Sequence, residues 1–476
     1  MKKNKPDPFL QNPDQTVDLH GLRFPMEYLF RGCLVVGQPG SGKTRTILMP
    51  LFRAILDATG TNPHDKASFV IVDAKNEFAP FVAQALREVG REDDLIILKP
   101  GSAFYNPLAS PFLTTGEMVE KIISLANHTN RDPMRRARGD EAFWANALRS
   151  ILSSVINATR TIHGGQITFA ALNETFRVIN KFPNASAAME WMRENDLTEE
   201  TIEGIRDFLI LPEDKTRPCV ATSMANTIYF WKNEPLKQLT TPSQGLPVIN
   251  PMDIVHRGKV LLISCTSAAY GTSISPLHVA LKEHFFSTLL GRDEIEVCGE
   301  DGHWGPINQT RPVFIFADEA QSYLTPDSTM GELVALDRLR SFRGGYIAAT
   351  QNLSSIHSVM GDAAHATRLI SLFANQIFMS NICPTSAAQA THILGQKKIK
   401  DKQREMTNSM SPPLLFRETQ SARKHESGSV IETTRRVPRV DAAALAKMPT
   451  GEFWIRLANG QVYHKTAPFI SMVRSK

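Results

Sequence analysis

The sequence reads Leu34-Val35-Val36 and continues Gly37-Gln38-Pro39-Gly40-Ser41-Gly42-Lys43-Thr44. This second stretch has the form G-x-x-x-x-G-K-[ST], in which a buried strand enters a glycine-rich turn and the turn opens a helix. The glycines let backbone N–H groups approach phosphate oxygens, and the helix start adds its positive dipole end. We expect Lys43 to reach the β- and γ-phosphates of ATP and the Thr44 hydroxyl to bind Mg²⁺. The alternative, a glycine-rich corner without a ligand, is disfavoured by the flanking strand and helix, so the stretch predicts nucleotide binding.

The composition is that of an ordinary globular protein. The chain has 476 residues, of which 42% are hydrophobic and 21% charged, a size that allows about two to four domains. Its five cysteines are far apart and its histidines are scattered, so we predict neither a metal cluster nor a disulfide framework, and we expect a reducing compartment. The net charge of +5 is only a weak indication of anionic partners.

The chain shows no membrane segment. No apolar stretch reaches the length of a membrane span, and Met1-Lys2-Lys3-Asn4-Lys5-Pro6 leads into polar residues rather than into a signal peptide. We therefore expect a cytoplasmic location without a transmembrane segment of its own, with any contact to the inner membrane made through a partner protein.

Apolar runs typical of buried parallel strands occur in two parts of the chain, residues 16–103 and residues 236–476. Residues 104–235 between them show helical periodicity with few β-branched runs. We therefore predict an α/β core with a mostly parallel twisted sheet, interrupted by an inserted all-α domain. Residues 1–15 are expected to form a disordered tail. The polar segment at about 396–434 is expected to be a mobile loop or a long hairpin.

A second acidic motif follows another predicted strand, in Phe314-Ile315-Phe316-Ala317-Asp318-Glu319. We expect Asp318 to hold the Mg²⁺ water shell and Glu319 to polarise the attacking water. A solvated acidic turn is the alternative, and the phosphate loop upstream disfavours it. Gln351 ends the next strand, where a polar side chain projects into the ligand crevice of a parallel sheet, so we expect it to sense the γ-phosphate or orient the water.

A basic helix end lies between these two strands. One of its arginines could enter the site of a neighbouring subunit and neutralise charge in the transition state. Arg340 is the preferred candidate, whereas Arg338 and Arg343 are as readily explained as solvated side chains.

Several motifs in a fixed order resemble the coupling-protein ATPases of conjugation and type IV secretion, the TraG/TraD-like group. The resemblance extends from about residue 17 to residue 470. The segment Asp73-Ala74-Lys75-Asn76-Glu77 is similar to the family's D-P-K-G-E segment, and Asn106-Pro107-Leu108 is similar to its N-P-L start of the helical domain. Asp318-Glu319, Arg340 and Gln351 follow in the family's order, and Met448-Pro449-Thr450-Gly451-Glu452 resembles part of its C-terminal strand pair.

This resemblance implies a RecA-like P-loop motor that assembles as a ring, usually a homo-hexamer. Such a ring hydrolyses ATP and moves DNA or a relaxase-type nucleoprotein toward a secretion channel, with a membrane-channel or relaxosome protein as partner. Two features depart from the family: the chain lacks the N-terminal transmembrane helices of most members, and Asn76 replaces a glycine. A soluble relative in viral packaging, element mobilisation or antiphage defence is also compatible with these motifs.

Two functional classes remain open. The chain is either a DNA-translocating ATPase or a nucleotide-regulated receptor that recruits protein cargo without pumping DNA. Glu319, Arg340 and Gln351 favour the motor, since a switch needs none of them. Two basic clusters in predicted loops, residues 131–138 and 397–404, could face DNA, yet a solvated charge run is as good an interpretation of each.

Overall fold

A computed structural model describes residues 15–109, 113–129, 141–212, 215–299, 302–325, 330–406 and 428–467. The predicted tail at 1–15 lies outside this part of the chain except for its last residue, and so does the basic cluster at 131–138.

The centre of the molecule is a nine-stranded sheet in the order β15-β14-β11-β3-β10-β9-β4-β6-β5. From β11 to β5 all neighbours are parallel, whereas β14 and β15 add an antiparallel edge. The central strands are fully buried, as expected for a parallel sheet covered on both faces. The strands of this sheet are β3 (Cys33–Val36), β4 (Ser68–Val72), β5 (Leu95–Leu98), β6 (Val260–Ile263), β9 (Val313–Ala317), β10 (Gly344–Thr350), β11 (Asn375–Phe378), β14 (Glu452–Arg456) and β15 (Val462–Thr466).

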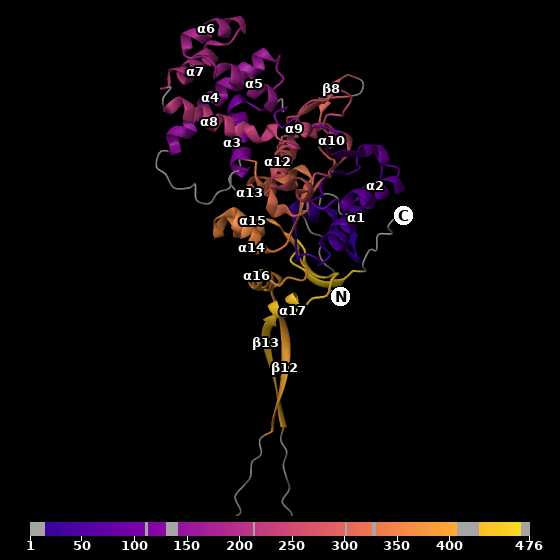
Figure 1. The fold of residues 1–476 in the computed structure, drawn as a ribbon. Helices are drawn as coiled ribbons and strands as arrows, with labels where there is room; N and C mark the ends of the chain where they lie inside the picture. The colour runs from indigo at the N-terminus through magenta and orange to yellow at the C-terminus, as the bar shows by residue number, and fades with distance from the viewer. Residues whose placement is uncertain are drawn as a thin grey trace, which may run out of the picture.

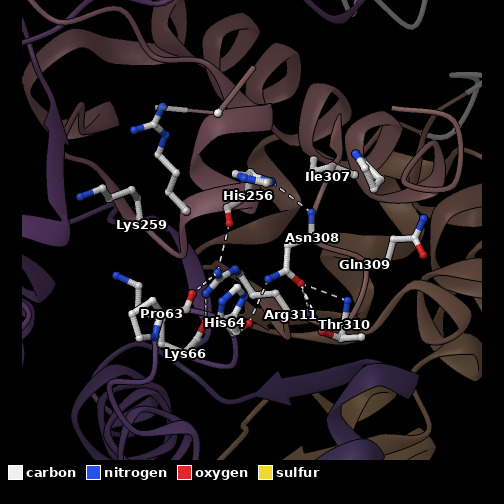
Figure 2. Close-up of a pocket in the computed structure, with 13 residues that line it drawn as sticks. Pro63, His64, Lys66, His256, Lys259, Ile307, Asn308, Gln309, Thr310 and Arg311 are labelled. Carbon is white, nitrogen blue, oxygen red and sulfur yellow. Dashed lines mark hydrogen bonds between the residues drawn. The ribbon is translucent and has the colours of Figure 1, made fainter. Parts of the chain in front are cut away.

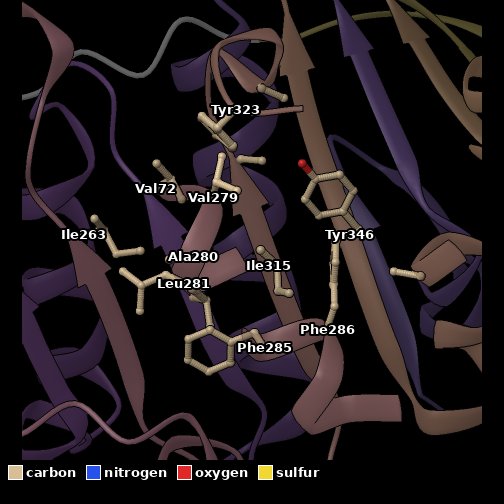
Figure 3. Close-up of a cluster of buried hydrophobic side chains, with 14 of the residues drawn as sticks. Val72, Ile263, Val279, Ala280, Leu281, Phe285, Phe286, Ile315, Tyr323 and Tyr346 are labelled. Atoms are coloured by element: carbon tan, nitrogen blue, oxygen red, sulfur yellow. The ribbon is translucent and has the colours of Figure 1, made fainter. Parts of the chain in front are cut away.

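Helices cover the sheet, and one of them is buried on all sides. This helix, α12 (Ser275–Leu290), places Val279, Phe285 and Phe286 against the strands in the cluster that Figure 3 shows. A helix that is apolar around most of its circumference has no solvent face, which is why it lies in the core. The other helices of the core are α1 (Met49–Thr59), α2 (Phe78–Glu88), α10 (Pro251–Arg257), α11 (Ser267–Tyr270), α13 (Glu332–Arg338), α14 (Leu353–Met360), α15 (Ala363–Leu372), α16 (Pro384–Leu394) and α17 (Ala442–Ala446).

A helical body separates β5 from β6 in the chain and lies to one side of the sheet (Figure 1). At its base, Phe104 forms a parallel bridge to Val248, and the Ile249 N–H donates to Phe104 O at 2.8 Å, so the two connecting segments run side by side. The helices of this body are α3 (Thr115–Thr129), α4 (Glu141–Ile162), α5 (Phe169–Ile179), α6 (Ala185–Glu194), α7 (Glu199–Ile210), α8 (Thr216–Tyr229) and α9 (Leu236–Thr240). No helix in the described ranges is long and apolar enough to cross a membrane.

Three smaller strand pairs complete the fold: β1 (Thr16–Leu19) with β2 (Leu22–Pro25), β7 (Glu296–Cys298) with β8 (Trp304–Pro306), and β12 (Gln396–Met406) with β13 (Gly428–Pro438). The β12–β13 ribbon projects away from the body (Figure 1). The basic cluster at 397–404 therefore lies on a strand and not in the loop expected for it. The partner strand is rich in β-branched residues, which suits an antiparallel ladder.

Candidate nucleotide site

The phosphate loop leaves the carboxyl end of β3, between β10 and β11. The two neighbouring strands hold it by backbone bonds: the Gly37 N–H donates to Thr350 O at 3.2 Å, and the Gln38 N–H donates to Ser380 O at 2.8 Å. Gly42 has a φ of 95°, in the region that disfavours side chains. A Cβ on Gly37 would lie 2.6 Å from Ser41 Oγ, so this glycine is required by close packing as well.

The Lys43 and Thr44 side chains are buried at the start of the following helical turn, Lys43–Leu48. The Lys43 Nζ donates to Gly37 O at 2.5 Å and to Gln38 O at 3.4 Å, so it lies over the loop that would hold the phosphates. Burial lowers the pKa of Lys43, and the charges of Glu319 and Asp318 oppose that shift. The Thr44 hydroxyl donates to Asp318 Oδ2 at 3.4 Å. A hydroxyl beside a buried carboxylate suits Mg²⁺, which prefers oxygen ligands.

Asp318 and Glu319 follow β9, next to the phosphate loop. Asp318 is 1% exposed, and burial, with the neighbouring charge of Glu319, raises its pKa to about 6. Glu319 has a φ of 52°, an uncommon value for a residue with a side chain. The Tyr323 hydroxyl donates to Asp318 O at 2.8 Å and so holds the residue that follows β9 in place.

Three side chains hold the Glu319 carboxylate. Gln351 Nε2 donates to Glu319 Oε2 at 3.0 Å and Gln321 Nε2 donates to the same oxygen at 2.7 Å, while Lys75 Nζ lies 3.2 Å from Oε1. Burial raises the pKa of Glu319, but the Gln321 bond, the Lys43 and Lys75 charges and the Gln351 bond outweigh it and lower the pKa. Glu319 is therefore a carboxylate that is ionised and fixed in position.

Lys75 and Gln321 were not expected at the site. Lys75 reaches it from the turn after β4, which is adjacent to β9 in the sheet. Within that turn, the Asp73 carboxylate accepts the N–H groups of Lys75, Glu77, Phe78 and Ala79 at 2.8–3.3 Å.

Asn76 has a φ of 56° in the same turn, a left-handed conformation that favours glycine. Asparagine tolerates this left-handed conformation better than most residues. Its Oδ1 also accepts a bond from the Ser264 hydroxyl at 2.5 Å, a contact that glycine could not make.

The structure does not bring Arg340 to the site of its own chain. Arg340 lies in the short turn Leu339–Phe342 before β10, whereas Gln351 follows the other end of that strand. The seven residues of β10 span roughly 20 Å, since a strand rises about 3.3 Å per residue, and this length separates Arg340 from Gln351. Arg343 packs within its own chain, with its guanidinium 5.5 Å from the centre of the Phe30 ring.

A buried ion pair behind the site was also missed from the sequence. Lys282 on α12 and Glu332 on α13 are 2% and 1% exposed and form a salt bridge. The Lys282 Nζ also donates to Tyr323 O at 2.7 Å and to Thr325 Oγ1 at 3.0 Å, and Glu332 accepts the Thr325 N–H at 3.0 Å. The pair therefore anchors the segment that follows Asp318 and Glu319.

The fold and the site together define a RecA-like α/β protein with a P-loop and a helical body inserted between β5 and β6. The family model described as "Type IV secretory system Conjugative DNA transfer" matches residues 4–244. The chain belongs to this family, which confirms the resemblance inferred from the sequence.

Solved structures show the same fold. The bacterial conjugative coupling protein TrwBdeltaN70, in an unbound form, is 16% identical, with 98% of this chain and 92% of that chain covered and a TM-score of 0.64. The plasmid coupling protein TrwB in complex with ADP and Mg²⁺ is 17% identical, with 97% and 90% covered and a TM-score of 0.62. VirB4 of Thermoanaerobacter pseudethanolicus is 13% identical, with 92% and 89% covered and a TM-score of 0.51. No curated protein matches the chain. The predicted α/β fold class is confirmed.

Proposed function

We propose that this chain is an ATPase that assembles as a ring, most simply a homo-hexamer, and drives DNA or nucleoprotein through conjugative transfer. One observation carries the proposal: the ionised Glu319 carboxylate is held by Gln351, Gln321 and Lys75 beside Lys43, Thr44 and Asp318. A switch that only binds nucleotide does not need a carboxylate fixed in this way. Membership of the conjugative DNA transfer family supports the cargo and a relaxosome or inner-membrane channel partner.

Each residue has a role in this proposal. The loop from Gly37 to Thr44 cradles the phosphates of ATP, and Lys43 turns from its loop carbonyls to the β- and γ-phosphates. Thr44 and Asp318 hold Mg²⁺, which neutralises phosphate charge when bound. The TrwB structure with ADP and Mg²⁺ supports both ligands. Glu319 accepts a proton from the attacking water, Gln351 orients that water, and Arg340 acts on the site of the adjacent subunit.

The division into a core of residues 16–103 and 236–476 and a helical domain of residues 104–235 belongs to the same proposal.

In the alternative function, the chain recruits protein cargo and the nucleotide only regulates assembly. Basic residues at 131–138 would then bind a protein partner and not DNA.

Glu319→Gln tests the chemistry. The variant should bind ATP normally and hydrolyse it on the order of 10²-fold more slowly, because the amide cannot accept a proton. Lys43→Ala should weaken nucleotide binding itself. Glu296→Gln, at an exposed glutamate on β7, is the matched control and should behave as the unchanged protein. Hydrolysis by Glu319→Gln at the unchanged rate would falsify the assignment.

Measurements with DNA separate the motor from the receptor. The ATPase rate is measured with and without single- and double-stranded DNA, together with the mass in solution. A motor should be stimulated by one of them and should bind it with a steep salt dependence, since phosphate contacts release counterions. Weak binding that does not change with salt, and no stimulation, would favour the receptor.

A further inference from the structure

A cavity of about 680 Å³ lies at the edge of the sheet opposite the phosphate loop. Its walls come from the segments that precede β4, β6 and β9 (Figure 2). Since these strands are parallel, their amino ends meet at this edge, while Asp318 and the phosphate loop lie at the carboxyl ends. The cavity is therefore separate from the nucleotide site.

Positive charge dominates the lining, which includes Lys66, Arg257, Lys259 and Arg311 together with His64 and His256. Within the described residues no carboxylate lines the cavity. The Asp94 carboxylate, which does not line the cavity, is shared by three cations: Lys66 Nζ lies 2.6 Å, Arg91 Nε 2.8 Å and Lys259 Nζ 3.2 Å from its oxygens.

Within the described ranges, Asp94 alone does not balance the cations that share it. It carries one negative charge against three bound cations, and Arg311 adds a fourth that makes its hydrogen bonds to backbone carbonyls of Pro63, Lys66 and His256. Asp65 also favours the charged form of Arg311, but its carboxylate is exposed and accepts a bond from Asn62. A surplus of buried positive charge is unfavourable unless an anion compensates it.

Three buried arginines carry N–H groups without acceptors, and of these Arg311 lines the cavity whereas Arg91 and Arg292 do not. Arg91, Arg292 and Arg311 are 3%, 1% and 1% exposed. Within the part of the chain that the structure describes, no atom accepts from Arg311 Nε, Arg91 Nη1, or Arg292 Nε and Nη2. Burial lowers the pKa of Arg311 to about 10 and that of Arg292 to about 9, so both remain cations at neutral pH.

His256, one of the two histidines of the lining, adds a neutral donor. The Asn308 N–H donates to His256 Nδ1 at 3.2 Å, which leaves Nε2 to carry the proton. Burial and the positive charges of Arg311 and Arg257 lower the pKa of His256 and keep the ring neutral.

We propose that this cavity binds a phosphate ester of nucleotide size. Arginine and lysine are the residues that hold phosphate oxygens, and a phosphate in the cavity would add negative charge beside Lys66, Lys259 and Arg311. The volume lies within the range of about 300–1,000 Å³ typical of small-molecule sites and exceeds what a bare phosphate needs. The ester is either a nucleotide unit of a DNA strand or a free nucleotide. The site does not depend on ATP hydrolysis by this chain.

The test uses the full chain with Lys43→Ala, so that the phosphate loop does not capture the probes. The probes are a fluorescein-labelled oligothymidylate of about eight nucleotides, within the range of single-strand site sizes, and unlabelled AMP. The variant is Arg257→Gln with Lys259→Gln, two side chains that are half-buried and only part of the wall. The control is Arg206→Gln with Lys215→Gln, two exposed cations of the helical body.

The cavity variant should bind at least about tenfold more weakly, and the control should bind as the parent does. Binding of the oligonucleotide without displacement by AMP identifies a DNA strand as the source, and AMP binding without oligonucleotide binding identifies a free nucleotide. An equal affinity in the cavity variant and the control overturns the proposal. Absence of binding of both probes to the parent also overturns it and would mean that water alone fills the cavity. Both outcomes are independent of whether the unsubstituted chain hydrolyses ATP.

Discussion

The buried pair of Lys282 and Glu332 gives a prediction with a definite magnitude. Lys282→Met removes the cation and leaves Glu332 buried, where it still accepts the Thr325 N–H at 3.0 Å and the Thr325 hydroxyl at 3.4 Å. Glu332→Leu leaves the Lys282 ammonium buried with the Tyr323 carbonyl and the Thr325 hydroxyl. Because a lone buried charge is poorly compensated, each single variant should lower the free energy of unfolding by about 3–5 kcal/mol.

The double variant, Lys282→Met with Glu332→Leu, has no buried charge at either of these two positions. What remains is the Tyr323 carbonyl and the Thr325 N–H, whose loss of partners costs about 1–3 kcal/mol each. We therefore expect the double variant to lose about 2–6 kcal/mol, less than the sum of about 6–10 kcal/mol for the single variants. Such a loss is a large part of a typical stability of about 5–15 kcal/mol.

Urea unfolding followed by far-ultraviolet circular dichroism, without nucleotide, measures the four proteins of this cycle. Arg149→Met is the control, since it breaks a pair with Glu120 in which the side chains are 41% and 50% exposed. That exposed pair should contribute no more than about 1 kcal/mol. Additive losses in the double variant would refute the reasoning, because they would mean that the two charges do not compensate each other.

Three further predictions concern the pH dependence of stability, the Asn76 turn and the subunit interface. Burial lowers the pKa of His278 to about 4. Between about pH 6.5 and pH 4 the unfolded chain therefore binds a proton at this histidine that the folded chain does not, and the folded state loses stability as the pH falls. His278→Gln should reduce this loss by about 1.4 kcal/mol per pH unit, measured by urea unfolding across that range. Because Asn76 has a φ of 56°, Asn76→Val should lower the stability by about 1–2 kcal/mol and Asn76→Gly by much less, and equal midpoints in urea would contradict the strain argument. Mixing Arg340→Ala with Lys43→Ala subunits should restore part of the ATPase rate, since a site that joins Lys43 of one subunit to Arg340 of the other is complete; no recovery at any ratio would count against a shared site.

Local signals predicted the fold class and most of the residues that gather at the nucleotide site. The phosphate loop is a contiguous stretch, and Asp318, Glu319 and Gln351 each follow an apolar strand that is recognisable on its own. The contacts of Lys75 and Gln321 with Glu319 could not be predicted from the sequence around these two residues. Lys75 meets Glu319 only because β4 is adjacent to β9, and strand order is a property of the whole sheet.

Buried polar residues were harder to predict from the sequence. Lys282, Glu283 and His284 interrupt the apolar pattern of α12 and are typical of a solvent face, yet all three are buried. Lys282 is bound by Tyr323, Thr325 and Glu332, and His284 by the Tyr105 hydroxyl, all of which approach from distant segments. The arginines beside the cavity were missed for the same reason, since isolated cations in loops are usually solvated.

The cavity and the nucleotide site share two strands, and this sets what kind of communication the fold allows. Strand β9 begins two residues after Arg311 and ends one residue before Asp318, and β4 begins two residues after Lys66 and leads to Asp73 and Lys75. Both strands are fully buried and hydrogen-bonded on each side, so they cannot bend independently of their neighbours. A ligand in the cavity can therefore act on Glu319 only by moving the strands as rigid units or through the segments at their ends. Any such coupling must be reciprocal, so a nucleotide at the phosphate loop would change the affinity of the cavity by the same factor.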